Sequence, residues 1–279
     1  MIDLLPFGPG AWAFIALYLL GMLAVGGVAW RARRDDTLAD FYLAGRGFGT
    51  LVLVMTLFAT QYSGNTFFGF SGSTYRMGYA WVMSMHFMTA IIVCYLAFAP
   101  RLRLLARERG YLTPSDYLLD RYGSPALAKV VAVLMTVALA NFLLSQLMAM
   151  GRALEGLAGA RADEAYRAGA AGLALVMVIY GTLGGMRAVA WTDAIQGGIM
   201  FVGLALILWL VVGRYGTLGE ATRLLLASGT PADLARVTPP GADRLREWMS
   251  YVLMFGLGAA MYPQAIQRIY AARTARALR

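Results

Sequence analysis

A short polar stretch inside a long apolar run is the feature that most constrains how this chain can fold. Residues 49–72 are long and apolar enough to cross a lipid bilayer, yet residues 59–66 in their middle read ATQYSGNT. The hydrocarbon region offers no partners for polar groups, so a helix there must unwind or face a cavity that solvates it. Secondary transporters bind substrate and ions at such interrupted helices, and the stretch therefore predicts a broken helix beside a binding site.

The composition indicates an integral membrane protein. The 279 residues are 59% hydrophobic and 14% charged, whereas soluble domains carry about a quarter charged residues. The formal net charge of +9 does not predict nucleic-acid binding, because the basic residues lie mainly between apolar runs without interleaved aromatic side chains. The single cysteine, Cys94, excludes an internal disulfide. The sequence has no metal-ligand cluster, nucleophile elbow or phosphate-binding loop, so we do not expect an enzyme.

Several apolar runs are candidate membrane spans, since a span needs about twenty mostly apolar residues. The chain, residues 1–279, is therefore predicted to form a single transmembrane domain with mostly brief loops. The seven predicted spans are 11–30, 49–72, 79–100, 126–150, 168–186, 193–212 and 248–270.

The basic residues predict how these spans are oriented in the inner (plasma) membrane. The loops that face the side opposite the N-terminus, together with the C-terminal segment, carry 15 basic residues, and the other side carries nine. Because cytoplasmic loops have an excess of arginine and lysine, we expect the N-terminus outside and the C-terminus in the cytoplasm.

Two loops are predicted to contain short helices. Thr113-Pro114-Ser115-Asp116 reads as an N-cap, a proline at the first helical position and an acid that faces bare amides. With its tyrosines and leucines, this helix should lie along the cytoplasmic membrane surface and end at Gly123. The polar segment 214–247 is expected outside, with a short helix near 218–227.

A second polar or flexible interruption occurs in the last span. Gly256, Gly258 and Pro263 weaken the helix of residues 248–270, although glycine in a membrane helix also serves close packing. This span lies five helices after the broken span 49–72, so the two cross the membrane in opposite directions. Two interrupted spans that are five helices apart and cross in opposite directions predict an inverted-topology repeat of five helices, in which each repeat begins with an interrupted helix.

Four segments resemble one transporter family. Residues 41–46 (FYLAGR), 69–72 (GFSG), 180–197 (YGTLGGMRAVAWTDAIQG) and 263–273 (PQAIQRIYAAR) are similar to those of the sodium:solute symporters, which include sodium/proline, sodium/pantothenate and sodium/glucose carriers. The resemblance implies an all-α, leucine-transporter-like fold of inverted five-helix repeats. Here it would comprise one extra N-terminal helix, the full first repeat and the first helix of the second.

The resemblance also implies an ion site. Sodium (Na+) would be held by the backbone carbonyls of Ala59 and Tyr62, at the break marked by Gly64. Gln61 departs from the family, because several members carry an aspartate there. Asp193 matches an acid on the ion's path to the cytoplasm. It also reads as an acid in the first turn of a helix capped by Thr192, and both roles can hold.

Other residues face the expected cavity by position and are candidate substrate contacts. They combine uncharged hydrogen-bonding groups with aromatic rings, which leaves the identity of the solute open. The candidates are Gln61, Ser63, Asn65, Thr66, Tyr180, Phe255 and Tyr262.

The function implied is sodium-coupled symport of a small organic solute such as an amino acid, monocarboxylate, vitamin or sugar. A proton-coupled carrier, a membrane sensor module of a signalling protein on the same fold, and a truncated fragment without transport activity are alternatives. Family members carry the whole second repeat, so we expect this chain to be an N-terminal portion. Its partners would be the solute, sodium, the lipid bilayer, and the missing C-terminal half or a partner chain.

Overall fold

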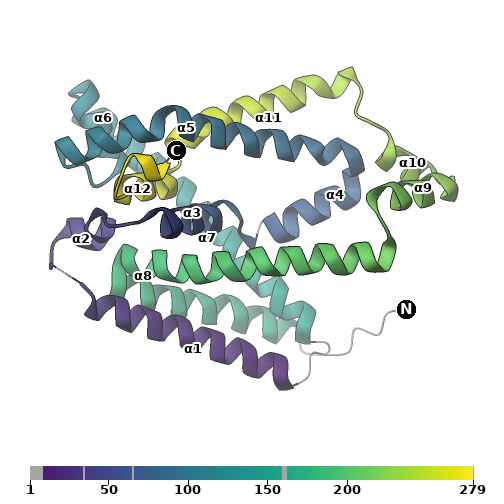
Figure 1. The fold of residues 1–279 in the computed structure, drawn as a ribbon, viewed down its shortest axis with the longest axis horizontal. Coiled ribbons are helices and arrows are strands. Elements are labelled where there is room, and N and C mark those ends of the chain that lie inside the picture. Colours follow the sequence, from purple (N-terminus) through teal and green to yellow (C-terminus); the bar gives the residue numbers. More distant parts are fainter. Residues whose placement is uncertain (1–8, 34, 65, 159–161, 279) are drawn as a thin grey trace.

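The computed structural model describes residues 9–33, 35–64, 66–158 and 162–278. Within them all regular structure is helical, apart from an isolated bridge between Phe48 and Ala272, so the predicted all-α class is confirmed. Long helices lie side by side along one direction of the molecule, and short helices gather at its two ends (Figure 1).

Among the described residues, four helices are long and apolar enough to cross a membrane. They are Ala13–Arg31, Thr66–Arg109, Pro125–Ala158 and Ala162–Tyr215. The first, third and fourth correspond to α1 (Pro9–Arg31), α7 (Pro125–Ala158) and α8 (Ala162–Tyr215), and the second includes α5 (Met83–Arg109). Most large apolar side chains on these helices are exposed, for example Leu208 at 65%, as expected for surfaces that face lipid.

Helix α8 is two arms joined at a sharp turn. Gly185 has φ 56° and ψ −150° inside it, and the chain reverses direction there (Figure 1). The predicted spans 168–186 and 193–212 therefore lie on the two arms of one long element. The reversal lets α8 pack extensively against α1, α3 (Thr50–Gln61) and α7.

The two spans with predicted interruptions are divided into shorter pieces. Span 49–72 contains α3, then the π-helical turn η2 (Thr66–Phe70) and the start of α4 (Ser71–Met77). Span 248–270 contains most of α11 (Leu245–Gly258), then the 3-10 turn η6 (Ala259–Met261) and α12 (Pro263–Ala271). The 12 residues of α3 are too few to cross a bilayer, which takes about 20.

Short helices mark the two ends of the molecule. One end holds α2 (Leu38–Leu43), η1 (Ala44–Arg46), α6 (Pro114–Tyr122) and α12, and the other holds α9 (Leu218–Ser228) and α10 (Pro231–Val237) (Figure 1). The remaining 3-10 turns are η3 (Gly78–Val82), η5 (Ala242–Arg244) and η7 (Arg276–Leu278). Helix α9 confirms the short helix predicted near 218–227, whereas α10 was not predicted.

The capped helix predicted after Thr113 is confirmed as α6. The Asp116 carboxylate accepts hydrogen bonds from the backbone N–H groups of Leu112 at 2.7 Å and Thr113 at 2.8 Å. Gly123 ends the helix with φ 61°, a conformation that favours glycine. The acid therefore satisfies two backbone donors at the start of the helix.

The best-packed core lies at the end that holds α2, α6 and α12. Leu43, Leu53 and Ala106 are fully buried there, beside Tyr111 and Tyr270. Buried arginines lie at the same end: Arg103, Arg187 and Arg268 are each at most 7% exposed. Polar contacts therefore contribute heavily to the structure at this end.

A candidate binding cavity between two interrupted helices

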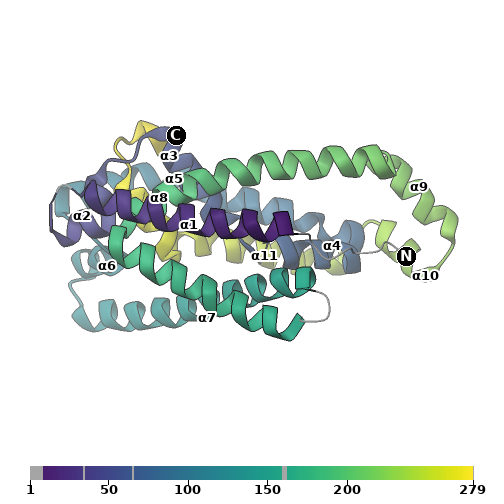
Figure 2. The same cartoon turned by 90° about the horizontal axis from the view of Figure 1, so that it is seen from below.

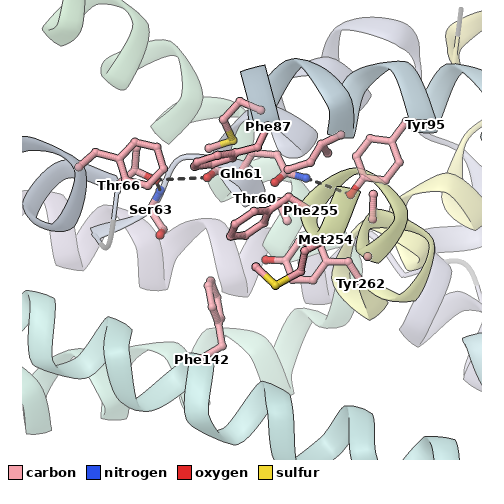
Figure 3. A pocket seen from close by; sticks show the side chains of 15 residues that line it. Thr60, Gln61, Ser63, Thr66, Phe87, Tyr95, Phe142, Met254, Phe255 and Tyr262 are labelled. Carbon is pink, nitrogen blue, oxygen red and sulfur yellow. Dashed lines mark hydrogen bonds between the residues drawn. The ribbon is translucent and has the colours of Figure 1, made fainter. Parts of the chain in front are cut away.

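The first interruption begins at Tyr62. Helix α3 ends at Gln61 because Tyr62 is extended, with φ −101° and ψ 105°. The N–H of Ser63, which would continue the helix by donating to the carbonyl of Ala59, instead donates to the Thr66 hydroxyl at 3.4 Å. That hydroxyl donates in turn to the carbonyl of Gln61, also at 3.4 Å (Figure 3). One threonine side chain thus bonds to the backbone on both sides of the break.

Gly64 lies in the interruption at a point of close helix contact. A Cβ atom there would lie 2.6 Å from the Cβ of Ala149 on α7. Any side chain at this position would push the interruption away from α7, so the glycine fixes how closely the two segments approach.

The second interruption falls at Tyr262, which is extended with φ −85° and ψ 100°. Pro263 follows as the first residue of α12, where its missing N–H costs no helix bond. Gly256 and Gly258, which we expected to mark the break, both lie within α11. A Cβ at Gly256 would lie 3.2 Å from the Cβ of Ala90, so this glycine serves close packing of α11 on α5.

A cavity of about 430 Å³ lies between the two interruptions (Figure 3). This volume is in the range of pockets that bind small organic ligands. Hydroxyl and amide groups lie on the α3 side, and aromatic and aliphatic side chains come from α5, α7 and α11. The lining residues include Thr60, Gln61, Ser63, Thr66, Phe70, Phe87, Met88, Ile91, Tyr95, Phe142, Met254, Phe255, Gly258, Ala259 and Tyr262.

The structure brings five of the predicted substrate contacts to this cavity: Gln61, Ser63, Thr66, Phe255 and Tyr262. Asn65 lies outside the described residues. Tyr180 is not among the lining residues. It lies on the first arm of α8 against α1, where a Cβ at Gly26 would come within 2.8 Å of the Tyr180 Cβ. Tyr180 therefore contributes to the close packing of α1 on α8.

The aromatic wall of the cavity was predicted only in part, because Phe255 and Tyr262 were expected there and Phe87 and Phe142 were not. The rings of Phe87 and Phe255 stack with centroids 4.5 Å apart and planes 21° apart. Phe87 is 2% exposed, and Phe142 on α7 lies with its ring 6.3 Å from that of Tyr262. Phe87 and Phe142 sit in ordinary apolar runs, and no sequence signal distinguishes them from packing residues.

A second cavity of about 390 Å³ shares a wall with the first. It lies between α3, α5 and η7, and Tyr62, Ile269 and Leu278 are among its lining residues. The side-chain amide of Gln61 donates to the Tyr95 hydroxyl at 3.0 Å, and both residues line both cavities. The Gln61–Tyr95 pair, whose hydrogen bond is drawn in Figure 3, therefore forms part of the partition between the two spaces.

Asp193 lies in a buried polar cluster near α3 and α12. Its Oδ2 accepts from the Thr56 hydroxyl at 2.5 Å and from Nη2 of Arg268 at 2.7 Å, and Nε of Arg268 donates to the Thr56 hydroxyl at 2.7 Å. The Arg268 and Asp193 side chains are 8% and 14% exposed. We did not predict a role for Arg268, because the sequence shows only a basic residue near the end of a span.

Thr192 is not a helix N-cap, contrary to the sequence interpretation. The second arm of α8 already begins after Gly185, so Thr192 and Asp193 lie well inside it. The Thr192 hydroxyl is fully buried and donates to the carbonyl of Val189 at 2.9 Å, a bond within the helix. Asp193 therefore owes its environment to Arg268 and Thr56 rather than to a helix terminus.

A second buried ion pair anchors the turn at Gly185. Arg187 donates from Nη2 to Asp40 on α2 at 2.7 Å, and from Nη1 to the carbonyl of Ala32 after α1. The Arg187 and Asp40 side chains are 9% and 4% exposed. This pair joins α2 and the segment after α1 to the turn of α8.

Comparison with known proteins identifies a family. A profile described as the sodium:solute symporter family matches residues 41–279. The sodium/pantothenate symporter of Escherichia coli (strain K12) is 31% identical over 231 residues, which cover 82% of this chain and 46% of that protein.

Two further relatives carry proline in their names. The sodium/proline symporter of Escherichia coli (strain K12) is 27% identical over 75% of this chain and 41% of that protein. The osmoregulated proline transporter OpuE of Bacillus subtilis (strain 168) is 29% identical over 69% and 39%, respectively. The chain spans about half the length or less of these curated relatives. No solved structure matches it significantly.

Proposed function

This chain belongs to the sodium:solute symporter family, and on that premise we propose that it forms the solute- and sodium-binding part of a secondary transporter. Its named relatives are transporters rather than enzymes. The transport reaction breaks no covalent bond, so the binding residues need only hold and release their cargo. The convergence of both interrupted helices on one cavity is the observation that carries the proposal.

The solute would occupy the 430 Å³ cavity. The polar lining consists of hydroxyls and one amide, and no charged side chain is among the lining residues described. Gln61, Ser63 and Thr66 would hydrogen-bond the polar part of the solute, and Phe255 with Tyr262 would cover its apolar part. The N-terminus of α12, directly after Tyr262, supplies positive potential for a carboxylate. This chemistry suits an amino acid, a monocarboxylate or a vitamin, and it also accommodates a sugar.

Sodium would bind at the carbonyls of Ala59 and Tyr62. Sodium is a hard cation that prefers oxygen ligands, and unwinding frees backbone carbonyls for it. The diversion of the Ser63 N–H to Thr66 supports this, because the Ala59 carbonyl loses the helix bond from that donor. Asp193, near α3 and held by Arg268, would lie along the ion's path from the site.

We also propose the inverted repeat and its orientation. The repeat is supported by the two interruptions, each with an extended tyrosine, and by their predicted separation of five helices, which would make the two spans cross the membrane in opposite directions. The end that holds α2, α6 and α12 would face the cytoplasm, in keeping with its many arginines. Sodium would stabilise the unwound form of α3, and the helices that carry the site would then rock to expose it to the other side.

The first test is sodium-dependent binding by the purified protein in detergent. Thermal unfolding is followed with proline, pantothenate, a monocarboxylate and a sugar, each in sodium or potassium chloride. A bound solute at 100 times its Kd stabilises the native state by about 2.7 kcal/mol. We expect one solute class to raise the Tm in sodium only.

Matched threonine variants distinguish a loss of solute binding at the cavity from a general effect on folding. Thr66→Ala removes the hydroxyl that bridges the interruption, whereas Thr89→Ala removes one that bonds only within α5. We expect Thr66→Ala to abolish the sodium-dependent shift and Thr89→Ala to retain it. Stabilisation that is equal in sodium and potassium would refute sodium coupling, and a response unaffected by Thr66→Ala would refute this cavity as the site.

A further inference from the structure

A third cavity lies outside the proposed transport site, at the end that holds α2, α6 and α12. It has a volume of about 510 Å³ and is lined from α5, α6, α7, η6 and α12. Figure 2 shows α6 beside α7 at this end of the molecule. Most of its lining is apolar, including Phe98, Leu105, Leu118 and Ile266. An apolar hollow where the helices leave the membrane can receive the acyl chains of a lipid.

One cationic side chain lines this hollow. Arg101 on α5 is exposed, and no hydrogen-bond or ion-pair partner for it is found in the described part of the chain. Arg109, two turns further along, contrasts with it by contacting Asp120 at 3.4 Å. A guanidinium without an acidic neighbour beside an apolar cavity complements a phosphate group attached to a hydrocarbon chain.

A buried hydroxyl in the cavity wall also lacks a partner. Tyr270 on α12 lines the cavity and is 1% exposed, and among the described residues its hydroxyl has no hydrogen-bond partner. The hydroxyl itself is enclosed by protein, so Tyr270 contributes wall surface to the cavity rather than a polar contact.

The position of the cavity favours a lipid over a soluble ligand. Helix α6 is amphipathic, and its Tyr117, Leu118 and Tyr122 line the cavity, with Tyr122 63% exposed. Tyrosine is enriched where a membrane meets water. Basic pockets between helices on the cytoplasmic side of membrane proteins bind anionic headgroups.

We propose that this cavity binds an anionic phospholipid, with Arg101 at the phosphate and the acyl chains along α5, α6 and α7. The lipid would join α6 to α12, the segment that follows the second interruption. The proposal rests on the proposed orientation, with this end toward the cytoplasm, and it does not depend on the identity of the transported solute.

The test is lipid-dependent stability of the purified protein in a neutral detergent. Thermal unfolding is followed during titration with phosphatidylglycerol, with phosphatidylcholine and with inorganic phosphate, and native mass spectrometry counts bound lipids. We expect phosphatidylglycerol to raise the Tm and to bind as a single retained lipid. Phosphatidylcholine should do so far less, and phosphate alone should not, because the apolar cavity contributes to binding.

Matched arginine variants test the site itself. Arg101→Gln should weaken phosphatidylglycerol binding about fivefold, as expected for one lost cationic contact, while Arg101→Lys should retain most of it. Arg76→Gln, an exposed arginine on α4 at the other end, is the control and should behave as the unmodified protein. Leu118→Trp fills the apolar part and should remove the single retained lipid.

Several outcomes would overturn the proposal. Equal stabilisation by phosphatidylcholine would show an unspecific lipid effect, and equal stabilisation by phosphate would show a headgroup site without a lipid. An unchanged response in Arg101→Gln would place the lipid elsewhere, even if Leu118→Trp failed to fold. A structure in lipid with polypeptide or detergent in the cavity would exclude this occupant.

Discussion

Arg268 on α12 and Asp193 on α8 form a buried ion pair across 75 positions of the sequence, with Nη2 and Oδ2 2.7 Å apart. Thr56 on α3 completes the cluster by accepting from Arg268 and donating to Asp193. The Asp193 carboxylate on the second arm of α8 therefore contacts both α3, which precedes the first interruption, and α12, which follows the second. Any movement of α3 or α12 that opens a path to this end must rearrange the cluster.

We predict that loss of either charge destabilises the protein strongly. Both side chains are at most 14% exposed, and removing one member of a buried ion pair costs about 3–5 kcal/mol because the other charge stays buried without a partner. Asp193→Asn and Arg268→Gln should therefore each lower the Tm in detergent by several degrees. Thermal unfolding with circular dichroism measures this.

The double variant distinguishes pairing from independent roles. If the two charges act as a pair, Asp193→Asn combined with Arg268→Gln should cost less than the two single changes added together. Thr89→Ala, which removes a hydroxyl bonded only within α5, is the neutral reference. Additive losses would contradict the coupling of α8 to α12 through this pair.

The interruptions could be predicted because their signals are local. Polar residues in an apolar run need partners wherever the run lies, so residues 59–66 pointed to a break without knowledge of any neighbour. The cap of α6 was equally predictable, since Asp116 bonds backbone groups only three and four residues away. In the second span Pro263 lies directly after the observed break, whereas Gly256 lies within α11 and allows close packing on Ala90, a contact that the sequence does not display.

The contacts between distant segments could not be predicted. Helical periodicity gives the face on which a residue lies, and not the residue opposite, so the pairing of Arg268 with Asp193 was missed. The same limit applies to the Phe87–Phe255 stack and to Tyr180, which packs against α1 instead of lining the cavity. The N-cap assigned to Thr192 was wrong because the helix boundary is set seven residues earlier, by the backbone of Gly185.

Gln61 and Tyr95 provide a prediction about the partition between the two cavities. Tyr95→Phe removes the acceptor for the Gln61 amide and should cost about 0.5–1.5 kcal/mol in stability, the net value of one hydrogen bond. It should also weaken solute binding, because the freed amide no longer holds the wall that both cavities share. Solute-dependent shifts in Tm measure the second effect.

The control for this prediction is another tyrosine hydroxyl. Tyr79→Phe removes the bond between Tyr79 and Thr222, which lies away from both cavities. It should leave the solute response unchanged while costing a similar amount of stability. An identical solute response in Tyr95→Phe and Tyr79→Phe would refute a role for the partition in binding.

The turn at Gly185 gives a prediction about folding. With φ at 56°, any other residue is strained, and a Cβ would lie 2.6 Å from the carbonyl oxygen of Phe41. Gly185→Ala should therefore destabilise the protein by more than about 1–2 kcal/mol and reduce the yield of folded protein. Gly181→Ala, where a Cβ meets nothing within 4 Å, should be neutral or slightly stabilising, since alanine favours helices by about 1 kcal/mol over glycine. Size-exclusion profiles and Tm values compare the two, and equal behaviour would contradict a special role for the turn.

Tyr111 gives a prediction about alkaline pH. Its ring is buried after the end of α5, and its hydroxyl donates to the Asp120 carboxylate. Burial, with a further contribution from that hydrogen bond, raises the pKa of Tyr111 from 10.0 to about 12. Because the folded state holds the proton more tightly than the unfolded state, this residue's contribution to stability is complete below pH 10 and is lost as the pH rises toward 12.

Thermal unfolding between pH 9 and pH 12 measures this loss, and Tyr111→Phe isolates it. Phenylalanine keeps the ring and removes the titrating group, so the variant should lose less stability than the unmodified protein over the interval from about pH 10 to 12. Tyr122→Phe, a substitution at an exposed tyrosine at the end of α6, should follow the unmodified protein. Parallel curves for Tyr111→Phe and the unmodified protein would mean that the Tyr111 hydroxyl titrates equally in both states, and that its bond to Asp120 does not link the end of α5 to α6.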